Sequence, residues 1–106
     1  MIIVTTNDLP GYRVTQVKGL ARGITVRSRS IVGNIGGAIQ SIFGGNISVY
    51  TNLAEQARQE ALSLLTSDAQ KMGANAIIAM RYDANEIMDG ITEVLAYGTA
   101  VVVEAN

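Results

Sequence analysis

Four carboxylates near the end of the chain are the residues whose types and spacing come closest to a chemical site. Asp83, Glu86, Asp89 and Glu93 lie within eleven residues, and Asn85 falls between them. Oxygen donors of this kind suit hard cations such as Ca²⁺ or Mg²⁺, although the spacing does not fit an EF-hand. We therefore expect at most weak binding of a divalent cation here. A solvated loop that faces basic partners is the favoured interpretation.

Charge is separated along the chain. Residues 1–30 contain five bases and one acid, whereas residues 83–106 contain five acids and no base. This arrangement predicts contacts between copies of the chain, basic region against acidic region. Nucleic-acid binding is disfavoured, because the pI is about 5.2 and few aromatic residues lie between the bases.

Residues suited to catalysis are scarce. The chain has no Cys and no His, which removes thiol chemistry, disulfides and the commonest general base. We expect no cofactor and favour a protein without enzymatic activity. A small-ligand or enzyme site between subunits, built from Arg27, Arg29, Arg81 and Tyr97, remains an alternative. Alternation along a strand would place Arg81 and Asp83 on one face, where a structural ion pair is the favoured role.

The apolar content is high for so short a chain. Hydrophobic residues make up 48% of its 106 residues and charged residues 16%. The segment 94–103 is apolar on both faces, and an antiparallel strand usually leaves one face polar. We expect a single domain, 1–106, that buries its surplus apolar surface between subunits. No signal peptide or membrane span is visible, so we expect a cytoplasmic location without membrane contact.

The pattern of residue types predicts both strands and helices. The expected strands are 2–6, 12–18, 20–27, 46–50, 76–83 and 91–103, and the expected helices are 28–45 and 52–72. A bulge is expected at Gly19. Asn52 and Glu55 resemble a capping box at the start of the second helix, which Gly73 is expected to end. The last two strands are expected to form a hairpin joined by residues 84–90. The glycines at 33–37 lack the Lys-Ser/Thr of a phosphate-binding loop, so close packing is the favoured interpretation.

Several segments resemble one known family. Asp8-Leu9-Pro10-Gly11-Tyr12 is similar to its D-I-P-G-Y opening, and Met72-Gly73-Ala74-Asn75-Ala76 to its L-G-A-N-A motif. Residues 26–30, 44–51, 81–83 and 93–103 also match in order. The chain resembles the YbjQ family of small uncharacterised proteins (uncharacterised protein family 0145). The resemblance implies an α+β, dodecin-like subunit with an antiparallel sheet packed by two helices, and a homopentamer assembled through strands.

The resemblance also carries a description of the family as heavy-metal-binding. Soft metals prefer thiolate, thioether or imidazole donors. This chain offers only the thioethers of its four methionines. Met72 and Met80 fall at apolar periodic positions and are expected in the core. Met88, beside Glu86 and Asp89, is the one thioether expected at the surface. We expect no tight soft-metal site.

Overall fold

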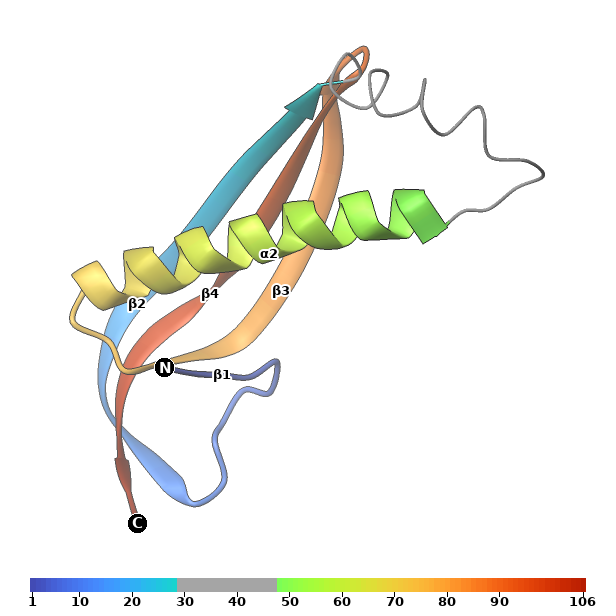
Figure 1. Ribbon diagram of the computed structural model, residues 1–106. Helices are drawn as coiled ribbons and strands as arrows, with labels where there is room; N and C mark the ends of the chain where they lie inside the picture. Colours follow the sequence, from blue (N-terminus) through green and yellow to red (C-terminus); the bar gives the residue numbers. More distant parts are fainter. Residues whose placement is uncertain (29–47) are drawn as a thin grey trace.

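The computed structural model describes residues 1–28 and 48–106, which form a four-stranded sheet and one helix (Figure 1). The elements are β1 (Ile2–Ile3), β2 (Tyr12–Ser28), α2 (Ser48–Lys71), β3 (Ala76–Met88) and β4 (Ile91–Ala105). The strand order is β1-β3-β4-β2. The α+β class is confirmed. The sheet is mixed rather than antiparallel, because β1 pairs with β3 in parallel. Two covering helices are not observed in the described residues: the predicted helix 28–45 lies outside them except for Ser28, which ends β2.

Strand β2 is one long strand where two shorter ones were expected. Its pairing with β4 shifts register between Val14 and Gln16 and again between Val17 and Gly19. Gly19 has a φ of +122°, a conformation that residues with a Cβ rarely adopt. The bulge predicted at Gly19 is therefore confirmed, and it bends β2 without ending it.

The segment before β2 folds back along the outer edge of β3. The strand expected at 2–6 is shorter, since β1 contains only Ile2 and Ile3. The chain continues beside β3 through irregular hydrogen bonds, in which the Ala79 amide donates to the Thr6 carbonyl at 2.7 Å. Ala79 has a φ of 53°, and the β3–β4 register shifts at this point. This short segment covers only the lower part of the β3 edge (Figure 1).

Helix α2 crosses one face of the sheet (Figure 1). Its buried stripe of Ala57, Ala61, Leu65 and Ala69 follows helical spacing and packs into the core. The helix begins at Ser48, so the expected cap at Asn52 and the expected strand 46–50, where described, are wrong. Gly73, with a φ of +84°, follows the helix as predicted.

The last two strands form the expected hairpin with a much shorter connection. Strand β3 continues to Met88 and β4 begins at Ile91, which leaves Asp89 and Gly90 as the turn. The loop predicted at 84–90 is therefore wrong. The Gly90 amide donates to the Glu86 carboxylate at 2.9 Å, and Gly90 has a φ of +78°. Polar composition indicated a loop, but these residues form an exposed strand.

The described part of the chain is long and thin. Its extents are 55 × 25 × 17 Å, and its radius of gyration is 17.1 Å. A compact domain of this length would have a radius of gyration of about 13 Å. The β3–β4 hairpin and the end of β2 extend past the helix at the top of Figure 1. One helix therefore covers only part of one sheet face.

Candidate functional site

A stripe of apolar side chains runs along β2 on the face of the sheet that α2 does not cover. Ala21 and Thr25 are buried toward the helix, so the even-numbered neighbours in this part of β2 face the other way. We call the exposed set the outer stripe, and their exposed fractions are 41–69%. Its members are Val14, Val17, Leu20, Ile24 and Val26.

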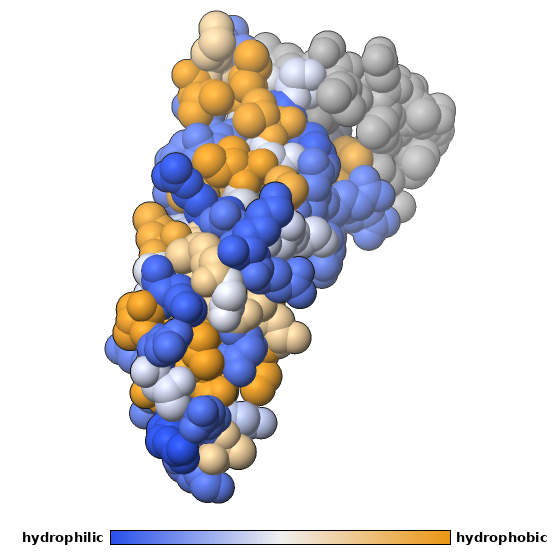
Figure 2. Space-filling view, turned by 90° about the vertical axis from the view of Figure 1, so that its left-hand side faces the viewer, coloured by the Kyte–Doolittle hydropathy of each residue, from blue (hydrophilic) through white to orange (hydrophobic). Residues whose placement is uncertain are grey.

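The outer stripe lies on an unpaired sheet edge. Strand β2 is the last strand in the order β1-β3-β4-β2, so one side of its backbone has no neighbouring strand. The Arg22 amide is satisfied by the Asp68 carboxylate of α2 at 3.0 Å. Figure 2 views the molecule from the left-hand side of Figure 1, where β2 lies, and shows apolar patches among charged ones over its length. This edge is a candidate surface for strand pairing.

Two residues of the hypothetical ligand site are neighbours in the sheet. Arg81 of β3 and Tyr97 of β4 are register partners. Arg22 of β2 faces Tyr97 from the other side, and sequence reasoning missed it because strand order is not visible in the sequence. The Arg81 guanidinium donates to the Thr5 carbonyl at 2.7 Å and to the Met80 carbonyl at 2.9 Å. Its observed partners are thus backbone carbonyls, and the expected ion pair with Asp83 is not among the described contacts.

The third residue of that hypothesis, Arg27, lies elsewhere. It pairs with Thr92 in register and its side chain is on the helix-covered face. Its guanidinium forms an ion pair with Glu60 of α2 and donates to the Thr25 hydroxyl at 3.0 Å. Hydrogen bonding by Arg27, and secondarily by Thr25, lowers the pKa of Glu60 below its ordinary value of 4.5. Arg29 and the glycines at 33–37 lie outside the described residues.

The four carboxylates occupy the β3–β4 hairpin but point in different directions. Asp83 and Glu93 lie on the outer face, where Asp83 accepts a hydrogen bond from the Asn85 side chain at 3.1 Å. Glu86, the register partner of Thr92, lies on the helix side, and Asp89 is in the turn. The described residues contain no group of three or more His, Cys, Asp or Glu side chains that could hold a metal ion. Within one chain these carboxylates do not converge.

The thioethers do not gather either. Met80 is buried in the core and Met72 packs against the same core. Met1 and Met88 are 44% and 65% exposed. Met1 precedes β1, which pairs with the start of β3, whereas Met88 is the last residue of β3. The core positions expected for Met72 and Met80 are confirmed. Met88 is exposed as expected, but it is not the one exposed thioether, because Met1 is exposed as well. No described thioether has the cysteine or histidine neighbours that a soft metal prefers.

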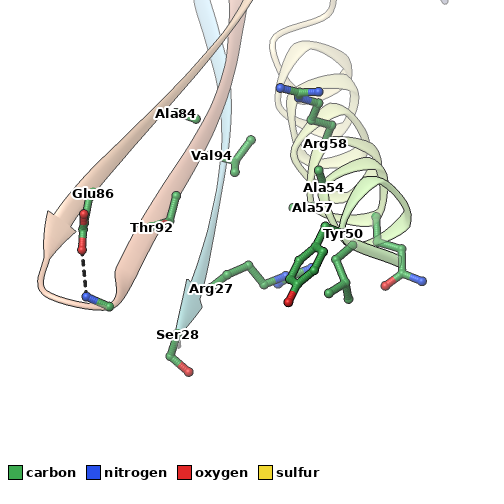
Figure 3. A pocket seen from close by; sticks show the side chains of 13 residues that line it. Arg27, Ser28, Tyr50, Ala54, Ala57, Arg58, Ala84, Glu86, Thr92 and Val94 are labelled. Carbon is green, nitrogen blue, oxygen red and sulfur yellow. Dashed lines mark hydrogen bonds between the residues drawn. The ribbon is translucent and has the colours of Figure 1, made fainter. Parts of the chain in front are cut away.

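A cleft opens between the first half of α2 and the hairpin (Figure 3). Its volume is about 640 Å³. The wall on α2 includes Leu53, Ala54 and Ala57, and the opposite wall includes Ala84 and Val94. The polar side chains that line the cleft are those of Arg27, Ser28, Tyr50, Gln56, Arg58, Glu86 and Thr92. Sequence reasoning missed this cleft because it depends on the angle at which α2 leaves the sheet.

The origin of the cleft is the tight contact farther along the helix. A Cβ built on Gly23 would lie 2.2 Å from the Ala61 carbonyl oxygen and 2.3 Å from the Leu65 nitrogen. The helix backbone therefore rests directly on β2 at Gly23. From that crossing toward Ser48 the helix diverges from the hairpin (Figures 1 and 3). The divergence, together with the alanines on both walls, leaves a space between these described elements.

Comparison with known proteins places these features in a family context. The family model described as "Putative heavy-metal-binding" (YbjQ) matches residues 1–104. A UPF0145 protein of Burkholderia thailandensis is 61% identical over 100 residues, which cover 94% of this chain and 90% of the relative. UPF0145 proteins of Burkholderia mallei and Burkholderia pseudomallei are 60% identical over the same share of each chain.

A solved structure supports the fold. The crystal structure of a protein of unknown function in the DUF74 family, from Pediococcus pentosaceus, aligns with a TM-score of 0.64 and 18% identity. The alignment covers 98% of each chain. At this identity the likeness supports the architecture alone. In the described part of the chain, no helix combines the length and the apolar character needed to cross a membrane.

Proposed function

The chain belongs to the YbjQ family, the UPF0145 proteins, and from that premise we propose that it is a cytoplasmic, non-enzymatic homo-oligomer assembled through its sheet. The family resemblance implies a pentamer. The proposed role of the exposed face and edge of β2 is assembly rather than catalysis. Two secondary candidates are a metal-binding site at the hairpin carboxylates and a small-ligand site around Arg81 and Tyr97.

The outer stripe is the observation that carries the proposal. Five aliphatic side chains, including Leu20 at 63% and Val17 at 69% exposure, lie along the outer face of a strand that has one unpaired edge. An unpaired edge with apolar side chains promotes pairing with another chain. Soluble monomers rarely leave large apolar patches open, and here only Arg22, between Leu20 and Ile24, interrupts the aliphatic side chains in this part of the face. A second copy that covers the outer stripe would satisfy both the edge backbone and the side chains.

A complementary edge exists on the other side of the same sheet. The backbone of residues 4–6 hydrogen-bonds to the backbone of β3 only up to Met80, and β1 pairs only with Ala76 and Ile77. From Arg81 to Met88 the outer side of β3 has no neighbouring strand among the described residues. Pairing of β2 in one copy with this part of β3 in the next would be heterologous, and a heterologous contact gives a closed ring when its rotation returns to the first copy. The pentamer requires such closure.

Charge favours the same orientation. Two bases of the N-terminal region are paired inside the chain, Arg13 with Glu104 at 2.7 Å and Arg27 with Glu60. Lys18 and the Arg22 side chain have no ion-pair partner among the described residues. The exposed Asp83 lies on the complementary edge. Such pairs contribute about 0–1 kcal/mol each, so they would guide association while the apolar stripe supplies affinity.

Light scattering coupled to size-exclusion chromatography tests the proposal. We expect a particle of about five times the chain mass of 11.2 kDa at micromolar concentration. A particle of one chain mass at that concentration would show that the sheet edges are not an assembly surface. A different stable multiple would retain assembly and exclude the pentamer.

The heavy-metal description of the family does not fit the donors of this chain. Cys and His are absent, two of the four methionines are in or against the core, and the hairpin carboxylates do not converge. Calorimetry with Zn²⁺, Cd²⁺ and Cu²⁺ should show no stoichiometric binding at submicromolar concentration. Such binding, if lost in the Glu86→Gln, Asp89→Asn variant, would establish a metal site at the hairpin and refute this expectation.

A further inference from the structure

We propose that the cleft between α2 and the β3–β4 hairpin binds a small organic carboxylate with an apolar body. This inference goes beyond assembly, because every residue it uses belongs to one chain. The volume of about 640 Å³ lies within the range of about 300–1,000 Å³ that is typical of small-molecule sites. The cleft is therefore large enough to enclose a ligand with a bicyclic or medium-length aliphatic body.

The walls favour an apolar body. Leu53, Ala54 and Ala57 of α2 face Ala84 and Val94 of the hairpin. Ala57 and Val94 are almost fully buried at the inner end, whereas Ala54 and Ala84 are exposed. The chain's apolar surface is thus continuous from its core into the open cleft. A ligand that covers these walls would remove apolar surface from water, which is the main source of affinity in such sites.

The rim favours a negative head group. Two guanidinium groups, those of Arg27 and Arg58, line the cleft against one carboxylate, that of Glu86. The Glu86 carboxylate already accepts a hydrogen bond from the Gly90 amide. Arg58 has no hydrogen-bond or ion-pair partner among the described residues. Figure 3 shows Arg58 extending from α2 toward the strands.

The two arginines have different roles. Arg27 is held by Glu60 and by the Thr25 hydroxyl, so its charge is largely compensated and its position is fixed. Arg58 is uncompensated and can rotate to form two parallel hydrogen bonds with a carboxylate. Tyr50 and Arg27 extend toward each other at the open end, where Tyr50 offers an aromatic face to the ligand body (Figure 3). Arg58 is therefore the expected anchor and Tyr50 the expected contact of the body.

Naphthalene-2-carboxylate is a suitable probe, with 2-naphthylmethylamine and 2-naphthylmethanol as controls of the same shape. Calorimetry on the full-length chain should show that the carboxylate binds about tenfold more tightly than the alcohol, because the charged hydrogen bond is absent from the alcohol. The amine should bind more weakly than the alcohol. Equal affinity of all three would overturn the assignment of Arg58 as an anion anchor.

Three variants locate the site. Arg58→Gln should remove the preference for the carboxylate and leave alcohol binding unchanged. Ala54→Trp should fill the cleft from an exposed position and weaken all probes that bind, by about tenfold or more. Leu20→Gln, on the outer stripe, should leave probe binding unchanged. Circular dichroism and particle mass, measured for each variant, separate loss of the site from loss of folding or assembly.

Two further results would overturn the proposal. One is the absence of carboxylate binding by the wild-type chain at millimolar concentration. The other is binding that responds to Leu20→Gln but not to Ala54→Trp, which would place the probe on the outer stripe. Because particle mass is measured separately, a monomeric protein that still binds the carboxylate would refute the assembly proposal and leave the cleft assignment intact.

Discussion

The two faces of the sheet differ in the size of their side chains, and the order is the reverse of what one chain alone would require. On the helix-covered face the packed positions are small, such as Ala21, Gly23 and Ala96. On the other face β2 carries Leu20 and Ile24, which stay 63% and 46% exposed. Large aliphatic side chains contribute most when they are buried. The comparison indicates that α2 needs close contact, whereas the face with large exposed side chains is the one that the assembly proposal expects a second copy to cover.

The energetic consequence is that the isolated subunit has a modest core. Seven of the eleven residues in its main buried cluster are alanines, and each alanine buries little area. A second, smaller cluster lies where Leu9 and Ile78 pack against Val101 and Val103 on the outer face. The middle of that face, around Leu95 and Tyr97, is only half-buried. Assembly through this face would therefore supply stability that the subunit lacks.

The largest effect should follow from replacing the large aliphatic side chains on the face that α2 does not cover. Leu20→Gln together with Ile24→Gln removes two side chains from each proposed contact, at about 2 kcal/mol per side chain, so each contact should lose about 3–5 kcal/mol. The dissociation constant of each contact should then rise by at least about a hundredfold. Sedimentation velocity over a concentration series measures this change.

The matched control for this pair is Leu64→Gln. Leu64 is 43% exposed on α2 and lines a surface hollow with Ile24 at the β2 edge, so the substitution makes the same chemical change in the helix layer, beside the proposed contact. It should leave particle mass unchanged. If Leu64→Gln dissociates the particle and the pair on β2 does not, the assembly surface is the helix, and the interpretation of the two faces is reversed.

The helix-covered face of the sheet, where the packed residues are small, should be sensitive to added side-chain volume. Gly23→Val places a side chain where the Ala61 oxygen and the Leu65 nitrogen already lie within 2.2–2.3 Å of the Cβ position. The helix must move away, since backbone atoms cannot yield locally, and the expected loss is about 3 kcal/mol. Urea unfolding at fixed protein concentration measures this loss, because the proposed assembly would make stability depend on concentration.

Gly11→Ala separates steric conflict from backbone strain. Gly11 has a φ of +87° and no atom within 4 Å of the Cβ position, so alanine meets only the conformational cost, about 1–2 kcal/mol. A loss at Gly23 no greater than that at Gly11 would mean that the helix can shift at little cost. The close crossing would then not explain why small residues line this face.

The sequence predicted the helix and the strands better than their ends. The apolar residues from Ala57 to Ala69 recur at helical spacing, and a helix places them all on one buried face, so α2 was predictable. Its start was not, because the Val49-Tyr50-Thr51 run favours a strand locally and the helix extends through it. Residues 84–88 have no apolar alternation because both faces of the hairpin are exposed. A polar strand of this kind resembles a loop in sequence.

The candidate sites required information that no sequence pattern contains. Arg22, Tyr97 and Arg81 form one row only because β4 lies between β2 and β3, an order set by tertiary packing. Glu86 is separated from Asp83 and Glu93 by the alternation of strand faces, which could be inferred only if 83–88 were known to be a strand. The cleft depends on the direction of α2 beyond Gly23.

The smallest effect concerns the ion pair that links the end of β2 to the helix. Arg27 lowers the pKa of Glu60, so the charged Glu60 stabilises the fold above the ordinary value of 4.5, and this contribution is lost as the pH falls through the lowered value. Arg27→Gln should raise the Glu60 midpoint toward 4.5, as measured by ¹³C NMR of the carboxyl group. The stability difference between the wild type and the variant should be present at pH 7 and should shrink below about pH 4.5. Arg58→Gln removes the same charge two positions before Glu60 and should shift the midpoint less. An equal shift in both variants would assign the lowered pKa to general positive charge, and the Arg27–Glu60 contact would no longer explain how α2 is fixed to the end of β2.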